Sequence, residues 1–330
     1  HRRGLMLTEN TIIGSMLVYM YAKCSCIAEA KQVFDKILNR NVVSWTSLIS
    51  GYTEYGHNVE ALDCVERMRL EGVFPNSVTF VCSLKACSSN KSTEKGQKLH
   101  QQVIIKGFLI SNVVVGNSVV DMYLKCGMLS KAHEVFNMLP TRDEVSWNIL
   151  LGGYLSHGYI EKAQHLFDKF KIRNVVAWNA LITGYAQHGL ASKASKCLKQ
   201  MKITGIRPDS VTYICILKAC SIVGSLEIGE EIDAEVRKQE LLQKDVVLGN
   251  TLVAMYAKCG ALMKAREVFD QLRIQNVVSW NALIAGYAHC GLGHEALKCF
   301  QQMRDDGVCP DSVTYICVLK CCGIIGSKRY

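Results

Sequence analysis

The sequence predicts an all-α protein, an α-solenoid superhelix of stacked helix-turn-helix repeats. Three observations support this fold class. Landmark residues return at fixed distances, since Trp45 and Trp178 are 133 residues apart and so are Trp147 and Trp280. Apolar residues between these landmarks recur at the spacing of one helical face. Glycines that interrupt the apolar pattern divide each repeat into two helical segments.

The repeats have three lengths, 35, 36 and 31 residues, which alternate in that order with one additional 31-residue unit near the middle. The 35-residue units end in GVFPN, GIRPD or GVCPD, the 36-residue units open with SVT and carry LKAC, and most 31-residue units carry YxKC. The predicted boundaries are 1–10 (partial), 11–41, 42–76, 77–112, 113–143, 144–174, 175–209, 210–245, 246–276, 277–311 and 312–330 (partial). The partial ends, and a first residue other than Met, predict that the sequence is a piece of a longer chain.

Each unit is predicted to hold two helices, as the unit that begins at Val277 illustrates. One apolar face consists of Trp280, Leu283, Ile284 and Tyr287, and a second consists of Ala296, Leu297, Phe300 and Met303. Gly291 separates the two helices, and Gly307 with Pro310 ends the second. A helical pair of this size cannot bury its apolar face alone, so neighbouring units must stack. Glycines inside the first helices are expected to permit close helix contact, and these are Gly51, Gly153, Gly184 and Gly286.

Composition restricts the class of protein without identifying a partner. Lys and Arg outnumber Asp and Glu by 38 to 29, and a net charge of +9 on 330 residues only weakly favours an anionic partner. The 16 cysteines recur within apolar helical patterns, which predicts free thiols in a reducing compartment. No apolar run reaches membrane-spanning length. No H-x-E, C-x-x-C, phosphate-binding loop or dinucleotide fingerprint occurs, so the sequence predicts no enzyme, no metal or cofactor, and no small-molecule substrate.

Two polar positions recur once per unit, where the packing pattern does not require polarity. The fifth residues are Ser15, Thr46, Asn117, Asn148, Asn179, Asn250 and Asn281, and the last residues of the same units are Asn41, Asn76, Asp143, Asn174, Asp209, Asn276 and Asp311. Helical repeats of this kind bind peptides or single-stranded RNA, and the fold alone does not decide. Short side chains with donors and acceptors suit the edge of a base, although the last residues could equally cap the next helix. The tryptophans share the apolar face and are predicted to anchor the core rather than to stack on bases.

The units VVSWNALIAGYAHCGLGHEALKCFQQMRDDGVCPD, SVTYICILKAC and VVLGNTLVAMYAKCGALMKAREVFDQL resemble the pentatricopeptide repeats of land-plant organelles, and the resemblance covers essentially the whole chain. The alternation of the three lengths resembles the PLS subclass of that family. The resemblance implies sequence-specific binding of single-stranded RNA, aligned 5′ to 3′ with the chain from its N- to its C-terminus, in a mitochondrion or a chloroplast. It also implies that the fifth and last residues of a unit select a base, and that an aliphatic second residue packs against that base.

Carried over to this sequence, the family's base-selecting pairs predict the site 5′-AANUCUNYU-3′. The pairs Ser15–Asn41 and Thr46–Asn76 favour adenine, Asn117–Asp143, Asn179–Asp209 and Asn281–Asp311 favour uracil, Asn148–Asn174 favours cytosine over uracil, and Asn250–Asn276 favours a pyrimidine. The 36-residue units carry Val81 and Ile214 at the fifth place, which cannot hydrogen-bond a base edge, so their base is uncoded. The base-sandwiching residues would be Ile12, Val43, Val114, Val145, Val176, Val247 and Val278, which could also be plain hydrophobic residues at a helix start.

Three lysines, Lys23, Lys125 and Lys258, recur eight residues after the fifth residue of their units. They are candidates for phosphate contacts, although they could simply face solvent. Members of the PLS subclass often carry a C-terminal deaminase-like domain, so the resemblance implies a specificity factor for organellar C-to-U RNA editing. Accessory proteins of an editing complex could dock on the 36-residue units. A role in RNA splicing, cleavage or stability, and a protein-interaction scaffold, stay open as alternatives.

Overall fold

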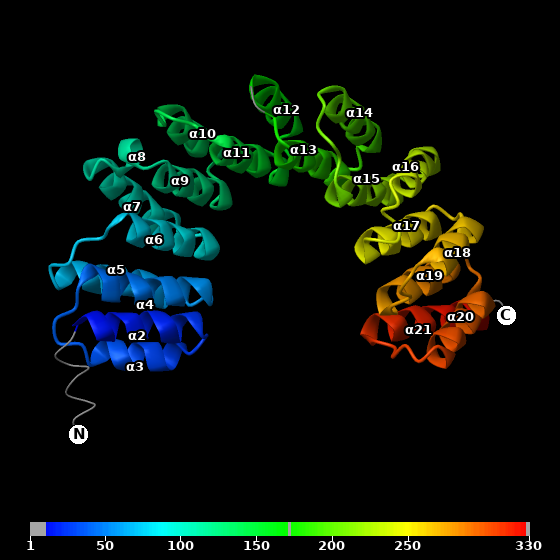
Figure 1. The fold of residues 1–330 in the computed structure, drawn as a ribbon, viewed down its shortest axis with the longest axis horizontal. Helices are drawn as coiled ribbons and strands as arrows, with labels where there is room; N and C mark the ends of the chain where they lie inside the picture. Colours follow the sequence, from blue (N-terminus) through cyan, green and yellow to red (C-terminus); the bar gives the residue numbers. More distant parts are fainter. Residues whose placement is uncertain (1–10, 171–172, 328–330) are drawn as a thin grey trace. The chain divides into compact units, whose positions relative to one another are not determined.

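The computed structural model describes residues 11–170 and 173–327, and every regular element within these ranges is an α-helix (Figure 1). The partial unit predicted at residues 1–10 lies outside the described residues. Contacts divide the chain into two compact units, His1–His157 and Gly158–Tyr330, and each is described here by itself. No helix among the described residues combines the length and the apolar character needed to cross a membrane.

The helices alternate between first and second helices of the predicted repeats. In the first compact unit they are α2 (Thr11–Lys23), α3 (Ile27–Asp35), α4 (Val42–Glu54), α5 (Asn58–Leu70), α6 (Ser77–Asn90), α7 (Thr93–Ile105), α8 (Phe108–Ser111), α9 (Val113–Lys125), α10 (Leu129–Met138) and α11 (Glu144–Ser156). In the second compact unit they are α12 (Ile160–Lys169), α13 (Val175–Gln187), α14 (Ala191–Ile203), α15 (Ser210–Val223), α16 (Leu226–Lys238), α17 (Val246–Lys258), α18 (Leu262–Gln271), α19 (Val277–His289), α20 (Gly293–Asp305) and α21 (Ser312–Ser327).

The first helices begin directly after a capping residue. Val42, Val175 and Val277 open α4, α13 and α19, and each follows an Asn in extended backbone whose side-chain oxygen accepts an N–H of the new helix. Such a cap satisfies a donor that the first turn of a helix leaves unpaired. These helix starts coincide with the first residues of the units that the sequence periodicity defines.

The difference in repeat length lies mainly in the second helices. The second helices of the 31-residue units, α3, α10, α12 and α18, span 9 or 10 residues, whereas α5, α7, α14, α16 and α20 of the longer units span 13. The 31-residue unit is therefore shorter by about one helical turn. In the first 36-residue unit an additional short helix, α8, packs its Phe108 ring 5.7 Å from the ring of Phe80.

The first helices of successive repeats pack side by side within each compact unit. The row is α2, α4, α6, α9 and α11 in the first unit, and α13, α15, α17, α19 and α21 in the second. Because a second helix returns the chain each time, successive first helices run in the same direction and their N-terminal ends line one edge of the row. Figure 1 shows α12 and α14 on one side of α13 and α15, so the second helices form a separate layer.

Tryptophans of the first helices anchor the core between the two layers. Trp45, Trp178 and Trp280 are at most 1% exposed. Each stands edge-on to a Phe of the preceding second helix, and the ring centroids are 4.6 Å apart for Phe34–Trp45, 4.7 Å for Phe167–Trp178 and 4.5 Å for Phe269–Trp280. Such edge-to-face pairs add to the free energy of burying the rings. The prediction that the tryptophans serve the core rather than a base-stacking surface is confirmed for these three, whereas Trp147 is half-buried, with its ring 5.1 Å from that of Phe136.

Two glycines inside first helices lie in close contact with the preceding first helix. A Cβ added at Gly286 would stand 2.5 Å from Cβ and 3.2 Å from Cα of Ala257 on the preceding first helix. A Cβ at Gly51 would stand 2.7 Å from Cβ of Ala22. Both positions therefore have room for glycine alone, as the sequence predicted for these sites.

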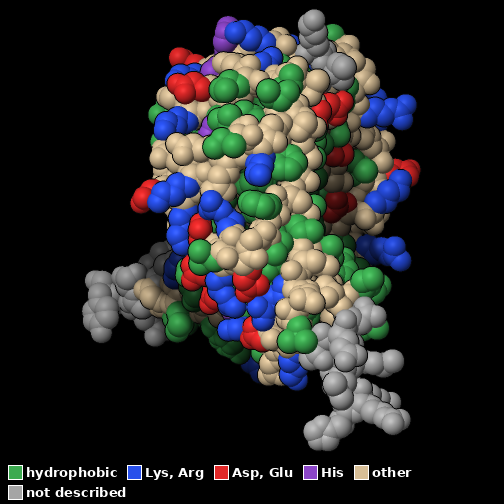
Figure 2. All heavy atoms as spheres, turned by 90° about the vertical axis from the view of Figure 1, so that its left-hand side faces the viewer, with side chains coloured by type: hydrophobic (Ala, Val, Ile, Leu, Met, Phe, Trp, Pro, Cys, Tyr) green, Lys and Arg blue, Asp and Glu red, His purple; other side chains and the backbone are tan. Residues whose placement is uncertain are grey.

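The sixteen cysteines are free thiols, as the sequence predicted. Burial raises the pKa of Cys87 and of Cys220 to about 12, so these thiols stay protonated at neutral pH and behave as small apolar side chains. The face drawn in Figure 2 carries Lys and Arg side chains interspersed with Asp and Glu, so charges of both signs meet there. The net charge of +9 therefore does not by itself locate a partner.

Candidate nucleic-acid interface

Four of the predicted base-selecting pairs are in direct hydrogen-bond contact. The amide Nδ2 of the fifth residue donates to Oδ1 of the last residue, at 3.2 Å in Asn117–Asp143, 3.0 Å in Asn179–Asp209, 3.2 Å in Asn250–Asn276 and 3.0 Å in Asn281–Asp311. The four fifth residues are at least nine-tenths buried, with exposed fractions from 5 to 9%. The fold thus returns the end of each of these units to its beginning, and two distant residues form one polar site.

The last residue of a unit also caps the next first helix, and this second role determines which of its atoms stays available. Oδ1 of Asp209 accepts the Thr212 N–H at 2.9 Å as well as the Asn179 amide. Oδ1 of Asn276 accepts the N–H of Val278 at 3.0 Å in the same way. With Oδ1 committed, the remaining atom is Oδ2 in an Asp, which is an acceptor, and Nδ2 in an Asn, which is a donor. Helix capping thus leaves one polar atom of each of these last residues available to a further partner.

The aspartates of these pairs are ionised at neutral pH. Burial acts to raise the pKa of Asp209, but hydrogen bonds led by those from the Thr212 N–H and the Asn179 amide outweigh it and hold that pKa below its usual range. The same balance lowers the pKa of Asp143, and hydrogen bonds led by a backbone N–H lower that of Asp311. Each carboxylate therefore presents an acceptor.

The pair Thr46–Asn76 is joined through a third residue. The Thr46 hydroxyl lies 2.7 Å from the hydroxyl of Thr79, and the Thr79 hydroxyl lies 2.9 Å from Oδ1 of Asn76. Asn76 also caps α6 by accepting the Thr79 N–H at 2.9 Å. The two predicted residues thus belong to one network although they do not touch directly.

Two predicted pairs differ from this arrangement. The Ser15 hydroxyl donates to the Thr11 carbonyl at 2.7 Å, and Asn41 caps α4, so within the described residues no hydrogen bond joins Ser15 to Asn41. Asn148 lies half-buried in the first compact unit, and Asn174 lies in the second, where its side chain caps α13. For Ser15, the hydrogen bond to the carbonyl four residues earlier is a common local alternative to a bond with a distant partner.

The predicted base-sandwiching residues form a row of exposed apolar side chains at the same helix ends. Their exposed fractions run from 54% for Val43 and Val176 to 69% for Ile12, and the rest of the row is Val114, Val145, Val247 and Val278. The second residues of the 36-residue units, Val78, Val211 and Val313, are exposed to nearly the same degree. Exposed apolar side chains are common on protein surfaces, so this row is compatible both with base contact and with plain hydrophobic residues at a helix start.

The three predicted phosphate-contacting lysines have different surroundings. Lys23 pairs with Glu54 of the next repeat at 2.8 Å, and Lys125 pairs with Asp121 of its own helix at 2.8 Å. Hydrogen bonding to the Glu54 carboxylate raises the pKa of Lys23. Lys258, by contrast, takes part in no ion pair within residues 11–170 and 173–327. It is therefore the lysine whose charge is most available to an anionic ligand.

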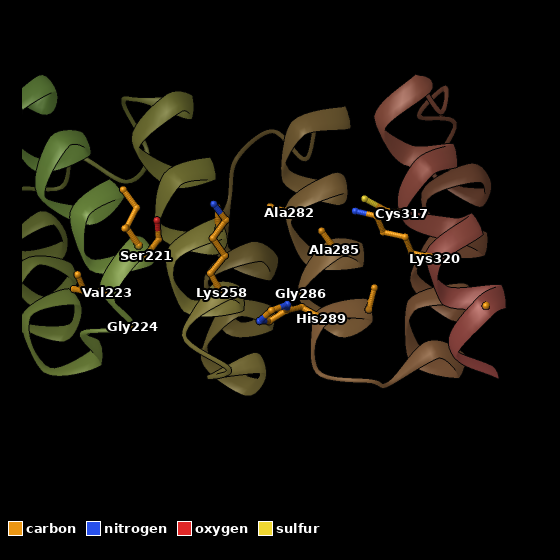
Figure 3. Close-up of a pocket in the computed structure, with 14 residues that line it drawn as sticks. Ser221, Val223, Gly224, Lys258, Ala282, Ala285, Gly286, His289, Cys317 and Lys320 are labelled. Atoms are coloured by element: carbon orange, nitrogen blue, oxygen red, sulfur yellow. The ribbon is translucent and has the colours of Figure 1, made fainter. Parts of the chain in front are cut away.

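Lys258 lines a cavity of about 1050 Å³ that extends over α15, α17, α19 and α21. Figure 3 shows Lys258 of α17 and Lys320 of α21 at this cavity, with His289 of α19 between them. Small residues such as Ala282 and Ala285 also line the cavity.

Lys320 and His289 are not among the residues that the sequence predicts for the site. Lys320 occupies the ninth place of a 36-residue unit, where Lys85 and Lys218 occur in the other two units of that length. All three lysines are exposed. Their recurrence at the same place of the unit, within LKAC or LKCC, is the signal that could have identified these lysines. His289 has no such repetition and could be found only from the structure.

Comparisons with known protein families identify the repeat. The PPR repeat family model matches residues 40–89, 173–221 and 275–323, and the PPR repeat model matches residues 117–143, 145–175 and 250–277. Together these matches cover more than half of the chain. Both models describe a structural repeat, and neither describes an enzyme.

Similar proteins occur among curated plant proteins. A chloroplastic pentatricopeptide repeat-containing protein of Arabidopsis thaliana is 35% identical over 95% of this chain and 45% of its own length. A mitochondrial one of the same organism is 36% identical over 100% of this chain and 48% of its own length. The chain thus spans less than half the length of these relatives. Their locations agree with the organellar localisation expected from the sequence.

Solved structures with the same fold support this assignment. The crystal structure of the maize pentatricopeptide repeat protein PPR10 aligns over 93% of this chain and 51% of that chain, with a TM-score of 0.58 and 19% identity. PPR10 in complex with an 18-nt psaJ RNA element aligns over 97% of this chain and 53% of that chain, with a TM-score of 0.52 and 17% identity. The predicted α-solenoid fold class is confirmed, and the chain belongs to the pentatricopeptide repeat family.

Proposed function

We propose that this chain is a sequence-specific binding module for single-stranded RNA, of the PLS subclass, in which each repeat faces about one base. The observation that carries the proposal is the hydrogen bond between the fifth and the last residue, which recurs in four repeats with the same atoms. A recurring polar pair whose identity varies is what selection of one base per repeat requires. The structure of the related PPR10 with an 18-nt RNA element supports the same class of ligand.

The atoms left free by helix capping support the base preference of each pair. In Asn179–Asp209 the available Oδ2 is an acceptor, which complements the N3–H donor of uracil. In Asn250–Asn276 the available Nδ2 is a donor, which complements the N3 acceptor of cytosine. The polarity offered by the last residue therefore separates the two pyrimidines. On this basis the chain selects 5′-AANUCUNYU-3′, with the 5′ end facing the N-terminal repeats.

The exposed apolar row supplies the non-polar part of the interface. Val176 and Val278, more than half exposed at the first turn of their helices, would hold a base between the side chains of adjacent repeats. Aliphatic contact of this kind contributes at or below the ~1 kcal/mol per base that marks the low end for aromatic stacking. Because Val78 and Val211 continue the row through the 36-residue units, those units can hold a base that they do not select.

Lysines of the first helices supply the electrostatic part of the interface. Lys258 and Lys320, which line the cavity over α17 and α21, would contact phosphates along one strand. Lys23 and Lys125 are weaker candidates, since a carboxylate already neutralises each ammonium group. Phosphate contacts of this kind add affinity without adding sequence preference.

This chain spans less than half the length of its relatives. In the whole protein, the module would direct C-to-U RNA editing in a mitochondrion or chloroplast. The sequence-specific repeats would bring a deaminase-like activity to one cytidine. Accessory proteins of the editing complex would dock on the 36-residue units, whose fifth residues Val81 and Ile214 leave them free of base selection. One solenoid running through all repeats would let the pairs of both compact units bind one continuous RNA.

Fluorescence anisotropy with labelled oligonucleotides tests the RNA-binding proposal. The chain should bind 5′-AAGUCUGCU-3′ at least about tenfold tighter than a scrambled oligonucleotide of the same composition, because several mismatches each remove a hydrogen bond. Substituting adenine for the uracil that faces Asn179–Asp209 should weaken binding, whereas substitution at the guanines should not. Equal affinity for both oligonucleotides would contradict the base assignment, and no binding to either would leave the protein-interaction scaffold as the function.

A further inference from the structure

A buried threonine follows each 35-residue unit and contacts its base-selecting pair. Thr79, Thr212 and Thr314 occupy the third place of the next unit, and each is 0% exposed. The Thr212 hydroxyl lies 2.6 Å from Oδ1 of Asn179, and the Thr314 hydroxyl lies 2.6 Å from Oδ1 of Asn281. The Thr79 hydroxyl lies 2.7 Å from the hydroxyl of Thr46.

The hydrogen-bond inventory determines where the single proton of the Thr212 hydroxyl goes. The hydroxyl oxygen accepts the Asp209 N–H at 3.2 Å. Oδ1 of Asp209 already receives the Thr212 N–H and the Asn179 amide, whereas Oδ1 of Asn179 has no other donor among the described residues. The hydroxyl proton therefore belongs to the shorter contact with Oδ1 of Asn179. Both ends of the Asn179 amide are thereby held, Nδ2 by the carboxylate and Oδ1 by the hydroxyl.

The 31-residue units 113–143 and 246–276 lack this second contact. Their following third residues are serines, and the Ser146 hydroxyl donates to Oδ1 of Asp143 at 2.8 Å while the Ser279 hydroxyl donates to the Asn276 carbonyl at 2.8 Å. Oδ1 of Asn117 and Oδ1 of Asn250 are buried and have no partner within the described part of the chain.

The Ser146 and Thr212 hydroxyls lie at the same distances from their own caps, 3.2 Å from the cap nitrogen and 2.8 Å from its Oδ1. What distinguishes Thr212 is the additional contact of its hydroxyl with Asn179, and the methyl of threonine limits rotation of that hydroxyl. In units 113–143 and 246–276, which serines follow, only Nδ2 of the fifth residue is held by a hydrogen bond. Rotating the side-chain amide of that residue therefore breaks a single hydrogen bond.

We propose that Thr79, Thr212 and Thr314 are positioning residues for base selection. Each hydroxyl fixes the fifth residue of the preceding 35-residue unit in one orientation, so that the unit offers its base one pattern of donors and acceptors. The 35-residue units therefore discriminate their bases more sharply than units 113–143 and 246–276. This inference rests on the proposed RNA-binding function.

The substitution Thr212→Val tests the inference, because valine keeps the shape of threonine and removes the hydroxyl. The measured quantity is the ratio of the dissociation constants for oligonucleotides that carry cytosine or uracil opposite unit 175–209. This ratio should fall about threefold to tenfold, which corresponds to the net contribution of one neutral hydrogen bond. The same ratio opposite unit 277–311 should stay unchanged, since Thr314 is intact. A purely structural role would instead weaken binding to all sequences alike.

Two further variants complete the test. Thr183→Val makes the same chemical change in α13, where the hydroxyl lies 3.0 Å from Sγ of Cys215 and away from the pair, and it should leave both ratios unchanged. Ser146→Thr should raise the ratio opposite unit 113–143, and it carries the test even where Thr212→Val reduces folding. If Thr212→Val and Ser146→Thr both leave the ratio at the wild-type value, the inference is overturned but the proposed function is not. A wild-type chain without base preference at these positions would overturn the proposed function and the inference with it.

Discussion

The side-chain amide of Asn179 donates to Oδ1 of Asp209 at 3.0 Å, although the two residues are 30 positions apart in the chain. Asp209 simultaneously caps α15 by accepting the Thr212 N–H. One carboxylate thus joins the start of a repeat to its end and starts the next repeat. Folding stability and the proposed base selection both depend on this residue, and suitable substitutions separate them.

Asp209→Asn should change base preference without a large change in stability. Asn and Asp cap helices about equally well, and Asn276 shows that an Asn can cap and accept the fifth-residue amide together. The atom offered to the base changes from an acceptor to a donor, so preference opposite unit 175–209 should move from uracil to cytosine. Anisotropy with four oligonucleotides that differ at this base measures the shift. A uniform loss across all four bases would indicate damaged packing instead.

Asn112→Ala should lower stability without changing base preference. Asn112 caps α9 by accepting the N–H of Val114 at 3.1 Å, but it closes a 36-residue unit whose fifth residue is Val81. Loss of the cap should reduce the free energy of unfolding by about 1 kcal/mol. Chemical denaturation measures this loss, and the oligonucleotide panel should give wild-type ratios. A preference that changes at one base would mean that the 36-residue unit selects bases after all.

Gly286→Ala should destabilise the protein, whereas Gly152→Ala should not. The new Cβ at position 286 would lie 2.5 Å from Cβ of Ala257, and overpacking of this kind costs about 1–3 kcal/mol. A Cβ at position 152, also inside a first helix, meets no atom within 4 Å, so the helix gains up to about 1 kcal/mol of propensity. Denaturation midpoints should therefore move in opposite directions. Equal shifts would contradict the close helix contact at Gly286.

The preference for uracil should be independent of pH from 8 down to about 5, because carboxylates that keep their usual pKa near 4 or below stay ionised there. Hydrogen bonds hold the folded pKa of Asp209 and Asp311 below the ordinary value of 3.8. A carboxylate whose pKa is lower in the folded state than in the unfolded state stabilises the fold at pH values above the unfolded-state pKa. This stabilisation is lost as the pH falls through the folded-state pKa. These carboxylates should therefore contribute a decline in stability only below about 4 in an acid titration of unfolding, and Asp209→Asn should make that part of the decline shallower. A uracil preference that fades between pH 8 and 5 would mean that the carboxylates are not the selecting groups.

The sequence predicted the residues that depend on local rules, and missed those that depend on a neighbouring repeat. Helix starts and caps follow from an Asn or Asp before an apolar pair, so the position of Asn276 and of α19 could be inferred from one repeat. The Lys23–Glu54 ion pair and the contact of Thr212 with Asn179 join different repeats, and a pattern within one repeat contains no information about them. Ser15 was predicted to pair with the distant Asn41, but its hydroxyl instead donates to the nearby Thr11 carbonyl of the same helix.

Lys258→Ala should weaken binding to every RNA sequence by the same factor. Lys258 has no acidic partner within the described residues and lies at a cavity with Lys320, whereas the charge of Lys125 is engaged by Asp121. The loss of one phosphate contact should reduce the slope of log affinity against log salt concentration by about 0.7, the value for a single strand. Lys125→Ala should reduce the slope less, and Lys196→Ala, on the exposed side of the second helix α14, should leave it unchanged. A loss of affinity confined to one base, or an equal effect of Lys125→Ala, would mean that Lys258 does not contact a phosphate.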